Sequence, residues 1–186
     1  MSELYIGLMS GTSLDGIDAV LVDFADGVRL VGTHTIAMPD ALRARLMALC
    51  QSGPEEIERM GRVDSELGEL FAAASMGVLH SSEHKAAEVR AIGSHGQTIR
   101  HRPYGQHAFT LQIGDPNVIA ERTGITVVAD FRRRDIAAGG QGAPLVPAFH
   151  AAVFGHAVRN RIILNLGGVA NITVLPAGEP AATRGF

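Results

Sequence analysis

The feature that most constrains the fold is a pair of apolar runs near the N-terminus, joined by a loop of small residues. The runs cover residues 5–9 and 17–22, and the loop between them reads Ser-Gly-Thr-Ser-Leu-Asp-Gly. Short apolar runs on either side of glycines and polar residues are typical of buried strands joined by a turn. The sequence therefore predicts a strand-turn-strand unit whose loop approaches a ligand closely.

The loop is rich in groups that donate hydrogen bonds to an anion. Gly11 and Gly16 allow the backbone N–H groups to converge on one point, because glycine adopts conformations that other residues avoid. Hydroxyl donors are supplied by Ser10, Thr12 and Ser13. The loop is thus a candidate phosphate site, and a hairpin without a ligand is the alternative interpretation.

Two carboxylates accompany the loop. Asp15 and Asp18 are both candidate ligands for Mg²⁺, which prefers carboxylate and phosphate oxygens. The glycine spacing imitates the start of a P-loop, but Ile17 and Asp18 stand where a P-loop has Lys and Ser or Thr. We therefore predict a phosphate loop between two strands, not between a strand and a helix.

The composition indicates a globular protein of the cytoplasm. The chain has 186 residues, of which 46% are hydrophobic and 19% charged. Its formal net charge of −3 argues against a general surface for nucleic acid or anionic membrane. No run approaches the roughly 20 apolar residues of a membrane span, and the N-terminus does not resemble a signal peptide. We expect no nucleic-acid and no membrane partner.

Alternating strand and helix patterns predict an α/β fold. Strands are expected at residues 5–9, 17–22, 28–36, 89–93, 109–113, 125–129, 161–166 and 169–175. Helices are expected from Asp40 to the break at Gly53, and at residues 57–78, 118–122 and 145–154. A linker at residues 155–160 predicts an N-terminal lobe, 1–157, and the first strands of a second lobe, 158–186.

Polar residues follow two of the predicted strands. Ser94, His95, Gln97 and Thr98 come after the strand at 89–93, and ligands of α/β sheets lie beyond the carboxyl ends of strands. Sugar hydroxyls suit these side chains, although a single histidine in such a place is more often structural.

Three arginines follow the strand at 125–129. Arg132, Arg133 and Arg134 precede Asp135, and a solvated cluster is the commoner fate of such a run. At a strand end, one of the arginines could instead bind a carboxylate or phosphate with two hydrogen bonds.

A second strand-turn-strand unit repeats the pattern of the first. Asn165, Gly167 and Gly168 lie between the strands at 161–166 and 169–175. Two such loops, one in each lobe, are what a two-lobed phosphotransferase needs in order to hold a nucleotide tail.

Four motifs together resemble those of the anhydro-N-acetylmuramic acid kinase family. They are GLMSGTSLDG at 7–16, GSHGQT at 93–98, ADFRRRD at 129–135 and GGQGAP at 139–144. The resemblance covers essentially the whole chain. It implies a ribonuclease H-like or actin-like ATPase lobe, with a mixed sheet flanked by helices, and the start of a second similar lobe.

The resemblance also implies a reaction that uses ATP and Mg²⁺. Water opens the 1,6-anhydro ring of anhydro-N-acetylmuramic acid, and O6 is phosphorylated to give N-acetylmuramic acid 6-phosphate in peptidoglycan recycling. The family leads us to expect a homodimer as well.

Site residues follow from the resemblance by position. The ATP phosphates are expected at Gly11, Thr12, Ser13, Leu14, Asp15, Gly16, Ile17, Asp18, Asn165, Gly167 and Gly168. The sugar is expected at Ser94, His95, Gln97, Thr98, Arg132 and Asp135, with Arg132 opposite the lactyl carboxylate.

In the family, the segment that resembles residues 184–186 continues into an aspartate that acts as the base on the attacking water. That aspartate would follow Phe186, so we expect no catalytic base within the chain and no turnover by the chain alone. The alternatives are another kinase or a phosphatase of the same superfamily, or a non-catalytic module that binds sugar or nucleotide.

Overall fold

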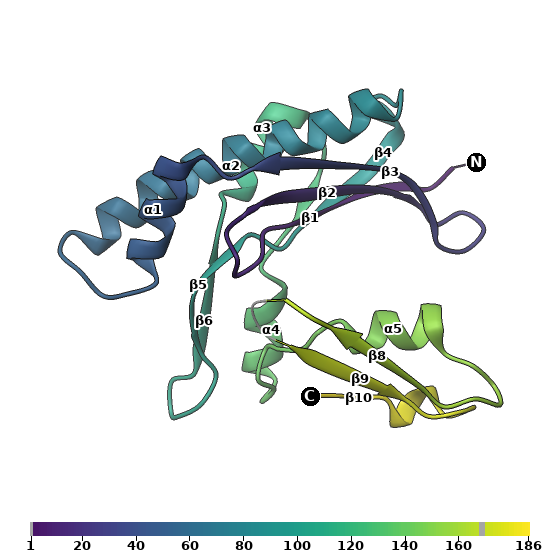
Figure 1. Ribbon diagram of the computed structural model, residues 1–186. Helices are drawn as coiled ribbons and strands as arrows, with labels where there is room; N and C mark the ends of the chain where they lie inside the picture. The colour runs from purple at the N-terminus through teal and green to yellow at the C-terminus, as the bar shows by residue number, and fades with distance from the viewer. Residues whose placement is uncertain (1, 168–169) are drawn as a thin grey trace. The chain divides into compact units, whose positions relative to one another are not determined.

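A computed structural model describes residues 2–167 and 170–186, which form two compact units (Figure 1). The first unit runs to Arg102 and resumes from Thr110 to Phe131; the second comprises Pro103–Phe109 and Arg132–Phe186. This grouping by contacts does not coincide with the division expected between residues 157 and 158, which stays a prediction about the domains.

A five-stranded mixed sheet is the centre of the first unit, with strand order β3-β2-β1-β4-β7. Strands β1 (Leu4–Met9), β2 (Gly16–Asp23) and β3 (Arg29–Ala37) are antiparallel neighbours. Strand β4 (Val89–Ser94) runs parallel to β1, and β7 (Val127–Val128) runs parallel to β4. The predicted α/β class is confirmed, and the first three predicted strands form an antiparallel meander.

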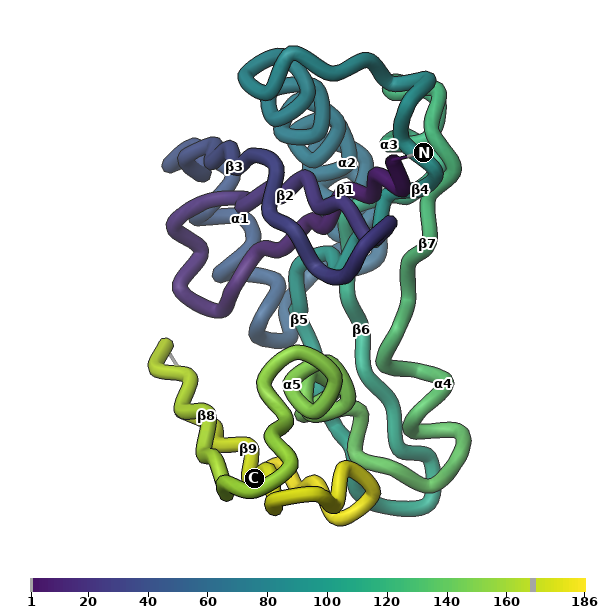
Figure 2. The backbone as a smooth tube through the Cα atoms, turned by 90° about the vertical axis from the view of Figure 1, so that its right-hand side faces the viewer, coloured from purple at the N-terminus to yellow at the C-terminus, as the bar shows by residue number. Residues whose placement is uncertain are grey.

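Helices cover one face of this sheet. The long helix α2 (Glu56–Ser81) lies along β1, β2 and β3, and α1 (Asp40–Leu49) and α3 (Pro116–Thr123) pack against α2 (Figures 1 and 2). Every second side chain of the strands points towards α2, where it packs against side chains that lie three or four residues apart on one face of the helix. The most deeply buried of them include Leu4, Ile6, Ile17, Leu21, Leu67, Phe71 and Ile92. Each stabilises the unit by about 1.5–3 kcal/mol.

The ends of α3 show why the helix forms where the sequence predicts it. Asp115 caps its N-terminus by accepting a hydrogen bond from the N–H of Asn117 at 2.8 Å, and Pro116 occupies the first helical position. Gly124 ends the helix with φ of 68°.

A two-stranded hairpin, β5 (Gln97–Arg102) and β6 (Phe109–Ile113), follows β4. Gln97 and Thr98 therefore lie at the start of a strand that the sequence pattern did not predict. Polar residues on both faces of β5 hide its period. Gly96 makes the turn possible: its φ is +72°, and a Cβ there would lie 2.7 Å from the carbonyl oxygen of Ile113.

The second unit contains a three-stranded antiparallel sheet with order β10-β9-β8. Its strands are β8 (Arg161–Asn165), β9 (Asn171–Leu175) and β10 (Arg184–Gly185), and α5 (Pro147–Phe154) packs against β9. The buried ring of His150 in α5 and the hydroxyl of Thr173 are 2.8 Å apart. One face of the sheet is thereby covered.

Three short helices complete the described chain. Helix α4 (Phe131–Ala137) carries the three arginines, for which the sequence predicted no helix, only a position after a strand at 125–129. The 3₁₀ helices η1 (Ala86–Glu88) and η2 (Pro180–Ala182) precede β4 and β10. None of the helices within residues 2–167 and 170–186 has both the length and the apolar character needed to cross a membrane.

Candidate functional site

The loop between β1 and β2 is anchored by an inward-pointing leucine. Leu14 is buried at 5% exposure with φ of 52°, and its N–H donates to the carbonyl of Gly11 at 3.2 Å. A Cβ at Gly16 would lie 2.6 Å from the carbonyl oxygen of Ile36, so β3 approaches too closely for any other residue. Gly16 is thus required by strand packing, independently of any phosphate.

Ser10 faces the interior, away from the surface of the loop. It is 2% exposed, and its Oγ donates to Oε1 of Gln97 at 2.6 Å while lying 3.2 Å from the carbonyl oxygen of Gly16. Its hydroxyl is therefore not available to a phosphate, contrary to the prediction for this residue. Thr12 and Ser13 are exposed.

Both candidate magnesium ligands are exposed carboxylates that accept a hydrogen bond from a neighbouring hydroxyl. Ser13 Oγ donates to Asp15 Oδ1 at 2.8 Å, and Thr35 Oγ1 donates to Asp18 Oδ1 at 2.7 Å. The hydrogen bond from Ser13 is the main reason why the pKa of Asp15 lies below its ordinary value. Asp15 is thus an anion at neutral pH.

These carboxylates fit the usual mode of Mg²⁺ binding. Mg²⁺ in phosphate-transfer sites is held by one or two carboxylates together with substrate phosphates and waters. Within the described chain, no group of three or more His, Cys, Asp or Glu side chains could hold a metal by itself. Asp15 and Asp18 both remain candidates.

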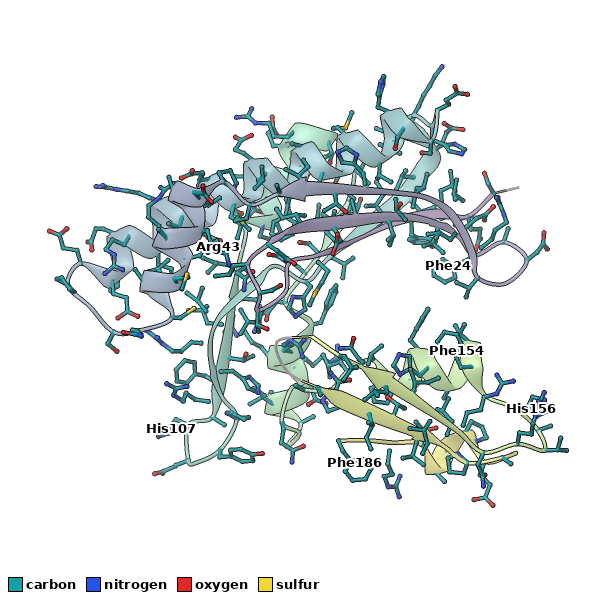
Figure 3. All side chains as sticks on the ribbon, in the orientation of Figure 1. Phe24, Arg43, His107, Phe154, His156 and Phe186 are labelled. Atoms are coloured by element: carbon teal, nitrogen blue, oxygen red, sulfur yellow. The ribbon has the colours of Figure 1, made fainter. Side chains whose placement is uncertain are left out.

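Arg43 is a cation beside the loop that sequence reasoning missed. It lies in α1, and its Nη2 donates to the carbonyl of Ser13 at 3.4 Å (Figure 3). Its charge contributes to the lowered pKa of Asp15. Pairing between β2 and β3 brings α1 here, since Met38 N–H donates to the carbonyl of Asp15 at 3.0 Å. The position of Arg43 beside the loop could have been predicted only from the pairing of β2 with β3.

Two of the residues predicted to bind the sugar, Ser94 and His95, lie where β4 ends. Ser94 is 1% exposed, and its Oγ has no hydrogen-bond partner among the described residues. The N–H of His95 donates to the carbonyl of Leu8 in β1 at 3.1 Å, and its Nδ1 donates to the carbonyl of Gly96 at 2.8 Å. A buried hydroxyl without a partner is costly, so water or a ligand group is expected at Ser94.

Gln112 extends the polar cluster along the hairpin, and its role could not be predicted from the sequence pattern. Its Nε2 donates to Thr98 Oγ1 at 3.0 Å and to Thr110 Oγ1 at 2.7 Å. Its Oε1 is buried and has no partner within the described part of the chain. Thr98, a predicted sugar residue, is thus held by β6, and a free acceptor lies beside it.

In the second unit, Arg132 and Asp135 hold the backbone of the same residue, Gly142. Arg132 Nη1 donates to the carbonyl oxygen of Gly142 at 2.6 Å, and Gly142 N–H donates to Asp135 Oδ2 at 2.7 Å. Burial lowers the pKa of Arg132 from its ordinary value. Both residues therefore order the loop at 139–142, and their contact with sugar stays a prediction.

The second predicted phosphate loop is described in part. Asn165 ends β8 and is paired with Asn171 of β9, and Gly167 follows. Gly168 lies outside the described residues. The assignment of these three residues to ATP stays a prediction.

Two solved sugar kinases are similar to the chain at 18% sequence identity and a TM-score of 0.44. One is a ROK family glucokinase from Streptomyces griseus in complex with glucose and AMPPNP, of which 46% is covered by 97% of this chain. The other is a ROK hexokinase from Thermus thermophilus, of which 49% is covered by the whole chain.

Curated relatives are far more similar. The kinases named anhydro-N-acetylmuramic acid kinase from Shewanella loihica and Shewanella amazonensis are 59% and 58% identical over 183 and 185 residues. These alignments cover 98% and 99% of this chain, which spans about half the length of the relatives, 49% and 50%. The family model described as anhydro-N-acetylmuramic acid kinase matches residues 3–186. The chain therefore belongs to the anhydro-N-acetylmuramic acid kinase family.

Proposed function

We propose that the chain is the N-terminal part of an ATP-dependent kinase that opens the anhydro ring of anhydro-N-acetylmuramic acid and phosphorylates O6. The product is N-acetylmuramic acid 6-phosphate, an intermediate of peptidoglycan recycling. Family membership over residues 3–186 is the observation that carries this proposal. The exposed residues Thr12, Ser13 and Asp15 of the loop at 11–15, together with the exposed Asp18 of β2, support it.

The reaction balances with water as the co-substrate. The oxygen of water bonds to C1 of the sugar while the bond from C1 to O6 breaks. O6 then bonds to the γ-phosphorus, and the bond from that phosphorus to the bridging oxygen of ADP breaks. ADP leaves, and one proton from water is released.

Residues of the first unit can position the phosphates. Backbone N–H groups of residues 11–13 and the exposed hydroxyl of Thr12 are donors for phosphate oxygens, whereas the hydroxyl of Ser13 donates to Asp15. Arg43 adds a positive charge beside the loop. Asp15 and Asp18 would hold Mg²⁺, which would neutralise charge on the transferred phosphoryl group.

The sugar is expected beside β4 and the β5–β6 hairpin. Ser94 and Gln112 present a buried hydroxyl and a buried amide oxygen that lack partners in the described chain. A sugar with hydroxyl and acetamido groups supplies both donors and acceptors. Gln112 is therefore added to the residues proposed for sugar recognition.

The proposal is tested by a coupled assay of ADP release with anhydro-N-acetylmuramic acid. We propose that residues 1–186 alone do not turn over and that a protein of the relatives' length does. General acid–base catalysis alone supplies about 10²–10⁴-fold, so loss of the base would silence the short chain.

The outcomes separate the alternatives. ADP release by the long protein that requires the anhydro sugar supports the kinase. Release with another sugar or a carboxylate supports a different kinase of the superfamily. Binding of the sugar without ADP release by the long protein supports a non-catalytic module, and sugar 6-phosphate formed by residues 1–186 alone contradicts the proposed inactivity of the short chain.

A further inference from the structure

We infer that Ser10 and Gln97 form a buried link that couples the phosphate loop to the sugar motif, with Ser10 acting as a positioning residue. This inference rests on the proposed function, because it assigns one ligand to each end of the link. In this inference, neither Ser10 nor Gln97 contacts the phosphates directly.

The contact is short, buried and long-range. Ser10 Oγ and Gln97 Oε1 are 2.6 Å apart, both residues are 2% exposed, and they are 87 positions apart in the chain. A hydroxyl has one proton, so donation to Gln97 leaves the nearby carbonyl oxygen of Gly16, at 3.2 Å, as a secondary neighbour. In a buried setting such a pair is held firmly, because breaking it strands both groups away from water.

The ends of the link belong to the two motifs. Ser10 directly follows β1 and opens the loop at 11–15, and Gln97 is the first residue of β5. The hydrogen bond from His95 N–H to the carbonyl of Leu8 closes a second connection between the same segments. The ends of β1 and β4 and the start of β5 therefore meet at Ser10.

Neighbouring glycines prevent the backbone from absorbing a shift. A Cβ at Gly16 would lie 2.6 Å from one carbonyl oxygen, and a Cβ at Gly96 would lie 2.7 Å from another. Both turns are thus packed directly against backbone of a neighbouring strand, at Ile36 and Ile113. Displacement of Gln97 by a sugar is consequently passed to Ser10 and the phosphate loop.

Coupling of this kind is reciprocal and measurable as a ratio of affinities. We expect the ATP analogue AMPPNP to tighten binding of anhydro-N-acetylmuramic acid by at least about fivefold in a protein of the relatives' length. Ser10→Ala and Gln97→Met are each expected to bring that factor close to one, measured by calorimetric titration of the sugar with and without AMPPNP.

Two further variants separate coupling from stability. Removing both partners in Ser10→Ala with Gln97→Met leaves no stranded group, so its melting temperature should recover while the coupling stays lost. Ser75→Ala is the matched control. Ser75 is a fully buried serine whose Oγ donates to the carbonyl of Phe71 at 3.0 Å within α2. It should lower the melting temperature and keep the coupling.

A ligand-free measurement separates this inference from the proposed function. In residues 1–186 alone, Gln97→Met should speed hydrogen exchange of the amides at 11–16, whereas Ser75→Ala should not. Wild-type protein that binds no sugar refutes the proposed function and leaves the exchange result to decide the link. Unchanged exchange in Gln97→Met, or coupling retained in Ser10→Ala, overturns the inference.

Discussion

Asp23 is a buried carboxylate that accepts hydrogen bonds from three different residues. The N–H groups of Glu3 and Ala25 donate to its Oδ1 at 2.9 and 3.0 Å, and Arg29 Nη2 donates to its Oδ2 at 2.8 Å. These hydrogen bonds, led by that from Ala25, lower the pKa of Asp23 from 3.8 to about 2. The carboxylate therefore ties the N-terminus to the turn after β2.

This lowered pKa predicts a stability difference that depends on pH. The stabilisation is fully present above the unfolded value of 3.8 and is lost as pH falls through about 2. In urea unfolding, the free energy of unfolding of the wild type should exceed that of Asp23→Asn by a constant amount above about pH 4. This difference should shrink between about pH 4 and 2. Asp26→Asn, in the same turn, is the control. A difference that does not change with pH would refute the assignment.

Ser94 permits a prediction in which stability and binding move apart. Its buried Oγ lacks a partner in the described chain, so Ser94→Ala removes no protein hydrogen bond. The melting temperature should stay the same or rise, whereas KM for the sugar should increase in a protein of the relatives' length. In Ser75→Ala, by contrast, a loss of about 1 kcal/mol is expected. A KM equal to that of wild type would remove Ser94 from the sugar site.

At the scale of elements, local pattern predicted the helices and most of the strands. Helices α1, α2 and α3 and strands β1 to β4 appear where periodicity and capping residues placed them. Strand β5 and helix α4 did not, because β5 is polar on both faces and α4 is a seven-residue helix that begins beside the arginine run.

In the candidate site, too, some residues could be predicted from local sequence and others could not. The segment at 11–18 could be predicted because its two glycines and two carboxylates lie close together in sequence. Arg43 and Gln112 could not, since their positions depend on pairing between β2 and β3 and between β5 and β6. Ser10 was assigned to phosphate because nothing in the sequence shows that Gln97 lies 2.6 Å away.

The contact between α2 and β3 leads us to predict how substitutions of two glycines in α2 change the stability. A Cβ on Gly77 of α2 would lie 2.4 Å from the ring of His34 in β3. Gly77→Ala should therefore destabilise the protein by about 1–3 kcal/mol, and adding His34→Ala should restore most of the loss. Gly61→Ala, in the same helix with nothing within 4 Å, should instead stabilise by about 0.5–1 kcal/mol. Equal effects at Gly77 and Gly61, measured by urea unfolding, would contradict the packing argument.

At the scale of the whole molecule, the relatives are about twice as long as this chain, and one face of its C-terminal sheet is apolar and exposed. Leu164 of β8 is 56% exposed and lies opposite Ile172 of β9. Ile172 exchanges both backbone hydrogen bonds with Phe186, which is 70% exposed, so the three side chains share one face. Ile162 extends this face at 66% exposure. An apolar face of this kind favours association, as does β8 as the edge strand of the sheet in the described part of the chain.

We therefore expect residues 1–186 alone to self-associate with increasing concentration in sedimentation velocity. Leu164→Lys should reduce that association, because a charge on the shared face opposes apolar contact. Val158→Lys is the control, since Val158 is 79% exposed and lies outside β8. In a protein of the relatives' length the additional residues should cover the face, so Leu164→Lys should there lower stability. A short chain that is monomeric at all concentrations, or two lysine variants that behave alike, would show that this face is not the one that drives association.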